Sequence, residues 1–73
     1  MQYYERLKEL RKGRAISQQH IAEILGIDKQ QYSDYENGIQ ELPLDYLVVL
    51  CMFYRVSSNY ILDLPKNLRY PKY

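Results

Sequence analysis

Two short helix-forming segments, separated by a three-residue break, constrain the fold of this chain more than any other feature. Residues 18–25 carry apolar side chains at helical spacing, and Ser17 before them is a favoured N-cap. Gly26 can end this helix, because glycine adopts the left-handed conformation at little cost. Asp28 is placed to cap a second helix over residues 29–36. Helices this short bury too little apolar surface alone, so the rest of the chain has to pack against them.

Three further helices are predicted around this pair. An apolar stripe predicts a helix over about residues 2–12, with Gly13 at its end. Pro43 suits the first turn of a fourth helix, and Ser57 is placed to cap a short fifth one. The side chains expected to face the core are Tyr3, Leu7, Leu10, Ile21, Ala22, Leu25, Ile27, Tyr32, Tyr35, Leu47, Leu50, Cys51, Tyr54, Tyr60, Ile61 and Leu64. The fold class is therefore expected to be all-α, a compact five-helix bundle.

The length and composition indicate one small domain. We assign residues 1–64 to this domain and residues 65–73, which contain two prolines, to a C-terminal tail. The single cysteine excludes an intramolecular disulfide and a zinc–cysteine cluster. The longest uncharged apolar run, residues 46–54, is less than half of a membrane span, and the N-terminus lacks a signal-peptide pattern. A cytoplasmic location is expected, with no metal, cofactor, small-molecule ligand or membrane partner.

The charges are unevenly distributed along the chain, although the net charge is only +1. Residues 5–14 carry a net +3, residues 15–45 a net −5, and residues 46–73 a net +3. Proteins that bind nucleic acid usually present a basic surface, because neutralised phosphates release counterions. The two basic ends therefore favour a nucleic-acid partner, whereas the acidic middle does not.

The helix over residues 29–36 is expected to keep one face in solvent. A helix of that kind fits the major groove of B-DNA, where base edges present a distinctive pattern of donors and acceptors. An enzyme is not expected, since the single histidine and single cysteine lie on different predicted helices. The sequence also lacks a glycine-rich phosphate loop and a close carboxylate pair.

Several stretches of the sequence resemble the Cro/phage-repressor type of helix-turn-helix regulator, also called the XRE family. They are RLKELR (6–11), ISQQHIAEILGI (16–27), YSDYENG (32–38), LPLDYL (42–47) and YRVSSNYIL (54–62). The resemblance covers about residues 5–64 and implies a lambda-repressor-like DNA-binding domain with a central helix-turn-helix. It implies a sequence-specific transcriptional regulator, expected to be a repressor, that binds double-stranded DNA as a dimer at a pseudo-palindromic operator.

The resemblance also implies which residues contact DNA. Gln18 occupies the position at which the family grips a phosphate and braces the recognition helix, and Lys29 and Gln30 occupy positions that face base edges. Their chemistry agrees, because glutamine pairs with adenine and lysine reaches guanine. The alternative for each is an ordinary solvated helix face. The full predicted DNA-binding set is Gln18, Lys29, Gln30, Gln31, Ser33, Asp34 and Asn37.

Asp34 is the main departure from the family, which often places a basic or amide residue there. A carboxylate repels phosphates, although it can accept a hydrogen bond from cytosine N4. Together with the acidic middle, Asp34 keeps open an alternative function: a protein-interaction module of the same fold, antitoxin-like or anti-repressor-like. A homodimer is expected to form through the fifth helix and the tail. Its apolar candidates are Tyr60, Leu64, Leu68, Tyr70 and Tyr73.

Separate predictions concern five charged residues. Arg11, Lys12 and Arg14 are expected near the DNA backbone or on a solvated face, and Glu36 is a candidate for internal pairing. Arg55 stands where the family often has asparagine or glycine, so the turn after the fourth helix is expected to be strained.

Overall fold

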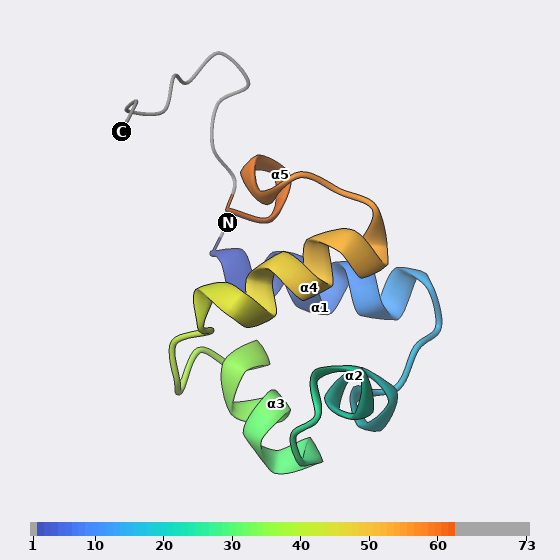
Figure 1. Cartoon of the computed structure of the whole chain (residues 1–73), viewed down its shortest axis with the longest axis vertical. Helices are drawn as coiled ribbons and strands as arrows, with labels where there is room; N and C mark the ends of the chain where they lie inside the picture. Colours follow the sequence, from blue (N-terminus) through green and yellow to red (C-terminus); the bar gives the residue numbers. More distant parts are fainter. Residues whose placement is uncertain (1, 63–73) are drawn as a thin grey trace.

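The computed structural model describes residues 2–62, and five helices make up its framework (Figure 1). They are α1 (Tyr3–Gly13), α2 (Gln18–Leu25), α3 (Lys29–Glu36), α4 (Leu44–Tyr54) and α5 (Ser58–Leu62). This order of helices, without a strand in residues 2–62, confirms the predicted all-α bundle. The tail predicted for residues 65–73, and Leu64 of the predicted core, lie outside the described residues.

The helix-turn-helix begins and ends at the residues that its capping signals predict. The Ser17 hydroxyl accepts a hydrogen bond from the backbone N–H of His20 at 3.0 Å, which caps α2. Asp28 caps α3 in the same way, with its carboxylate 2.8 Å from the backbone nitrogen of Gln31. Gly26 between them has φ +74° and occupies the left-handed region.

The backbone conformation at three helix ends can be compared with the sequence prediction. Gly13 is the last residue of α1, and the left-handed residue that follows is Ala15, with φ +55°. Pro43 lies just before α4 as its N-cap rather than in the first turn, since its ψ of 149° is extended. Arg55 has φ +58°, which confirms the strain expected after α4.

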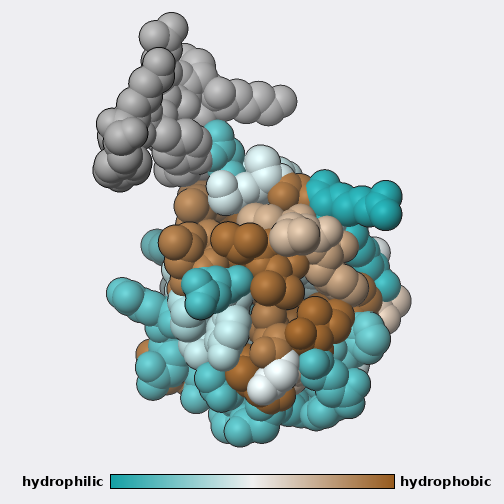
Figure 2. Space-filling view, in the orientation of Figure 1, coloured by the Kyte–Doolittle hydropathy of each residue, from teal (hydrophilic) through white to brown (hydrophobic). Residues whose placement is uncertain are grey.

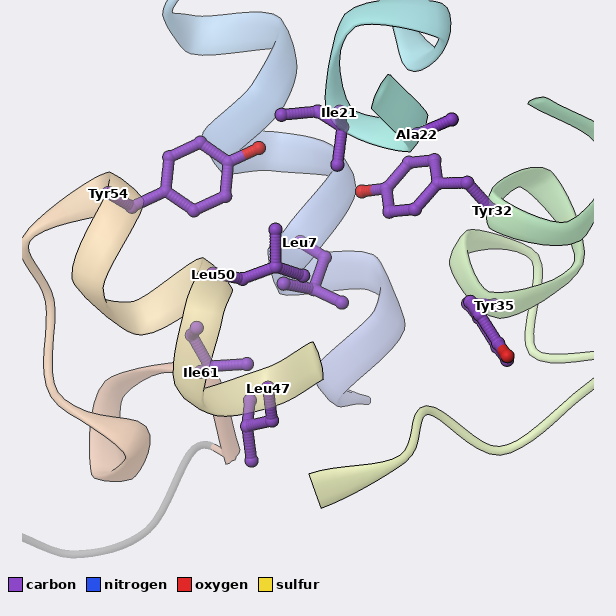
Figure 3. Packing of buried hydrophobic residues seen from close by; sticks show 9 residues of the cluster. All are labelled: Leu7, Ile21, Ala22, Tyr32, Tyr35, Leu47, Leu50, Tyr54 and Ile61. Carbon is purple, nitrogen blue, oxygen red and sulfur yellow. The ribbon is translucent and has the colours of Figure 1, made fainter. Parts of the chain in front are cut away.

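All five helices contribute side chains to one core (Figure 3). The phenol rings of Tyr32 from α3 and Tyr54 from α4 are fully buried on either side of Leu7 and Leu50. The complete buried apolar set is Leu7, Ile21, Ala22, Tyr32, Tyr35, Leu47, Leu50, Tyr54 and Ile61. Burial of each large side chain contributes about 1.5–3 kcal/mol to folding. This core fixes α2 and α3 to the rest of the bundle.

The predicted core included one side chain that is exposed and others that are only half-buried. Tyr60 is 44% exposed, and the guanidinium carbon of Arg6 lies 4.6 Å from the centroid of the Tyr60 ring. The half-buried side chains pack around the core instead of inside it. They are Tyr3, Leu10, Leu25, Ile27 and Cys51.

Helix α4 is apolar on its outer side as well as on its buried side. Leu44 and Met52 are 71% and 74% exposed, and Val48 and Val49 lie between them. Figure 2 shows the resulting apolar area where α4 runs across the molecule in Figure 1. We call the exposed apolar residues of α4 and α5 the α4–α5 face; they are Leu44, Val48, Val49, Met52, Tyr60 and Leu62. A helix that is apolar all round is usually covered on both sides.

Candidate nucleic-acid interface

One side of helix α3 is packed against the core, and the opposite side is open to solvent. Its buried side consists of Tyr32, Tyr35 and Glu36, all at most 7% exposed. Lys29, Gln30 and Gln31 are exposed in its first turn. In Figure 1, α3 lies beside α2 at the end of the molecule opposite α5. The helix is therefore positioned to present polar side chains to a partner.

A buried ion pair holds the C-terminal end of α3. The guanidinium group of Arg11 donates two hydrogen bonds to the Glu36 carboxylate, each with an N···O distance of 2.9 Å. A third Arg11 nitrogen donates to the backbone oxygen of Ile16 at 2.8 Å. The pairing predicted for Glu36 is confirmed, and Arg11 is committed to it rather than to a solvated face.

Gln18 joins the same network from the start of α2. Its amide nitrogen donates to the Glu36 carboxylate at 3.2 Å. This buried carboxylate therefore connects α1, α2 and α3. The bracing part of the role predicted for Gln18 has a structural basis in this contact, and its contact with a phosphate stays a prediction.

The ionisation of this network follows from its burial and its donors. Burial alone would raise the pKa of Glu36, but hydrogen bonds from Arg11 and Gln18 and the positive charge of Arg11 outweigh it, so the pKa is lowered. Burial, together with the nearby Glu36 charge, raises the pKa of the Tyr32 hydroxyl. The same two causes raise the pKa of Tyr54 to about 12. The network holds one compensated negative charge, and both phenols stay neutral at neutral pH.

Two glutamines of α3 are each held by a residue one turn further on. The amide nitrogen of Gln30 donates to the Asp34 carboxylate at 3.0 Å. The amide nitrogen of Gln31 donates to the Tyr35 hydroxyl at 2.9 Å. Residues four apart lie on the same side of a helix, which brings each pair together. Each glutamine side chain thus has a hydrogen-bond partner on its own helix.

A polar chain at the other end of α3 includes a residue that the sequence analysis missed. Lys8 of α1 donates to the side-chain oxygen of Asn37 at 3.3 Å, and the Asn37 amide donates to the Ser33 hydroxyl at 3.2 Å. Lys8 lies within the RLKELR stretch, but its proximity to Asn37, 29 positions away, comes only from the packing of α1 against α3.

The structure thus divides the predicted site residues into two groups. Lys29, Gln30 and Gln31 are exposed in the first turn of α3, and Asp34 accepts a hydrogen bond from Gln30 one turn further on. Gln18, Ser33 and Asn37 are held near its C-terminal end.

A second N-terminal arginine makes a tertiary contact although its side chain is exposed. Arg14 donates to the backbone oxygen of Tyr54 at 2.7 Å. Its guanidinium carbon lies 5.2 Å from the centroid of the Tyr54 ring. Arg14 therefore joins the end of α1 to the end of α4, a role that the sequence analysis did not predict.

No helix in the described part of the chain is long and apolar enough to cross a membrane. Among residues 2–62, no group of three or more histidine, cysteine, aspartate or glutamate side chains is placed to hold a metal ion.

The geometry agrees with the relatives of this chain. The helix-turn-helix family matches residues 7–61. The uncharacterized HTH-type transcriptional regulator YobD of Bacillus subtilis (strain 168) is 44% identical over 85% of the chain and 55% of its own length. From the same organism, HTH-type transcriptional regulator AnsR is 36% identical over 86% of the chain and 54% of its own length. The prophage-derived uncharacterized regulator YonR is 41% identical over 80% of the chain and 54% of its own length.

The chain spans about half the length of the curated relatives it matches. No solved structure matches it significantly. The family is one of regulators and not an enzyme class. The match over residues 7–61, the five-helix bundle and these relatives together show that the chain belongs to the XRE-type helix-turn-helix family of transcriptional regulators.

Proposed function

We propose that this protein is a sequence-specific DNA-binding transcriptional regulator that inserts α3 into the major groove. The observation that carries the proposal is the open side of α3. Lys29, Gln30 and Gln31 are exposed on it, while the opposite side is anchored by the core and by the Arg11–Glu36 ion pair. Amide and ammonium groups on a rigid helix are the chemistry that reads base edges.

Phosphate contacts come from residues around the C-terminal end of α3. Gln18 retains a second amide N–H beyond the one that it donates to Glu36. Lys8, Ser33 and Asn37 form a connected polar surface near the same end of the helix. Contacts of this kind fix the orientation of a protein on the duplex, whereas base contacts give the specificity.

The regulator acts as a homodimer and a repressor in this proposal. Exposed apolar residues of the α4–α5 face, Tyr60 and Leu62 among them, supply the described part of the contact surface. The tail residues predicted to extend it lie outside the described part of the chain. Two copies then place their α3 helices in half-sites about 34 Å apart on a pseudo-palindrome. Light scattering at tens of micromolar tests this, and a monomer at that concentration would contradict it.

The central experiment measures binding of the full chain to random-sequence duplexes across a salt titration, followed by selection of the bound sequences. We expect affinity to fall steeply with salt and a palindromic motif to emerge. Absence of binding even at low salt would overturn the proposed function.

Two observations favour a second candidate, a protein-interaction module of the same fold. Arg11 is paired with Glu36 inside the fold, which lowers the basic charge available to DNA, and α4 presents a large apolar surface. The two candidates differ in their response to mutation. If the protein-interaction function holds, Lys29→Ala and Gln30→Ala leave the activity in cells intact.

A further inference from the structure

We propose that Asp34 is a positioning residue that makes Gln30 select adenine over guanine. The inference rests on the proposed function, because it concerns the base that α3 meets in the major groove. It assigns a role to the residue that departs from the family pattern. Gln30 and Asp34 together, rather than Gln30 alone, determine which base is preferred.

The contact between the two side chains fixes the orientation of the Gln30 amide. A carboxylate only accepts hydrogen bonds, so the Gln30 atom that lies 3.0 Å from Asp34 has to be the amide nitrogen. One of its two N–H groups is thereby occupied. The second N–H and the carbonyl oxygen remain for a partner, so Gln30 offers one donor and one acceptor side by side.

This pattern is complementary to one purine and not to the other. Adenine presents an N7 acceptor and an N6 donor in the major groove, which match the free N–H and the carbonyl oxygen of Gln30. Guanine presents two acceptors, N7 and O6. An unrestrained glutamine can turn both N–H groups toward guanine, but Gln30 has already given one to Asp34. Its carbonyl oxygen would then face guanine O6, and two acceptors repel each other.

The Asp34 carboxylate strengthens the same discrimination. It is half-buried beside Gln30 on α3, and its negative charge disfavours any further acceptor nearby. Asp34 therefore lowers the affinity for all DNA sequences by repelling phosphates, but it increases the preference for adenine over guanine. Specificity is a difference between two affinities, and a repulsive element contributes to it.

The test measures binding of the full chain to two duplexes. One is its best selected duplex. The other has guanine in place of adenine at the position whose base preference is lost in Gln30→Ala. For the wild type we expect a preference for adenine of about tenfold or more. In Asp34→Ala this ratio is expected to fall toward unity, while the affinity for both duplexes rises. Asp34→Asn keeps an acceptor for Gln30 without the charge and is expected to retain most of the preference.

A matched control is available on α2, where Gln19 donates to Glu23 at 3.3 Å across the same four-residue spacing. Glu23→Ala removes an equal charge and an equivalent amide–carboxylate contact, and it is expected to leave the adenine-to-guanine ratio unchanged. If Asp34→Ala keeps the wild-type ratio while Gln30→Ala loses it, the role of Asp34 is refuted and the proposed function stands. If the wild type binds neither duplex, the proposed function fails and this inference fails with it.

Discussion

Arg11 in α1 and Glu36 at the end of α3 are joined by two parallel N···O contacts of 2.9 Å, and the Glu36 side chain is fully buried. The two residues are 25 positions apart in the sequence. Because Gln18 donates to the same carboxylate, one side chain sets the spacing of three helices. The position of α3 thus depends on a charge pair formed by residues other than the proposed base-reading side chains.

Loss of Arg11 is therefore expected to destabilise the whole fold. Arg11→Met leaves the Glu36 carboxylate buried without its cation, and we expect a loss of about 3–5 kcal/mol in the free energy of unfolding. Urea denaturation measures it. In a Glu36→Gln background the same substitution is expected to cost clearly less, since no buried charge is left unpaired. Equal costs in the two backgrounds would contradict the ion-pair explanation.

The same carboxylate predicts how stability depends on pH. The pKa of Glu36 is held below its ordinary value of 4.5, so the folded state releases the proton more readily than the unfolded state. Its contribution is fully present above about pH 4.5 and is lost as pH falls through the lower folded-state pKa. Unfolding measured between pH 7 and pH 3 is expected to show a smaller loss of stability for Glu36→Gln than for the wild type. Parallel curves for both proteins would refute this.

Two glycines allow the cost of a steric clash to be separated from the cost of a left-handed backbone. Both have positive φ, +74° at Gly26 and +75° at Gly38, but only a Cβ at Gly38 would meet the Tyr4 ring, at 2.7 Å. Gly26→Ala is expected to cost about 1–2 kcal/mol for the left-handed backbone. Gly38→Ala is expected to cost more, because the ring also has to move. In a Tyr4→Ala background the excess should disappear, and its persistence in thermal melts would exclude the ring as the cause.

The strained turn at Arg55 predicts a stabilising substitution. Its φ of +58° is costly for a residue with a Cβ, whereas glycine adopts it freely. After the entropy that glycine adds to the unfolded chain, Arg55→Gly is expected to gain about 0.5–1 kcal/mol. Arg55→Ala keeps the Cβ and should show no such gain in the same denaturation experiment. An equal gain for both variants would point to the arginine side chain instead of the backbone.

Lys8 is predicted to contact a phosphate, although the sequence analysis did not select it. It is held against Asn37 at the end of α3, so Lys8→Ala is expected to weaken binding to all duplexes alike. The slope of log affinity against log salt should fall by about 1. Arg55→Ala removes an equal charge at the turn between α4 and α5, away from α3 in Figure 1, and should leave the slope unchanged. Equal slopes for Lys8→Ala and the wild type would exclude the contact.

The sequence alone determined the helices and most of their ends. Capping by Ser17 and Asp28 and the left-handed Gly26 depend on local contacts within one turn of the chain, so their signals can be read from neighbouring residues. Periodic apolar side chains likewise indicated most of the buried side chains, with Tyr60 as an exception, because helical spacing is a local property. The family resemblance rested on the same residues.

Which distant side chains come into contact depends on how the helices pack. Nothing in the local sequence around Arg11, Arg14 or Lys8 distinguishes a side chain with a tertiary partner from a freely solvated charge, since their partners are 25 to 40 positions away. The exposed apolar side of α4 was also invisible to periodicity, because both sides of that helix are apolar. Where a side chain points is set by helix packing, and packing depends on the whole core at once.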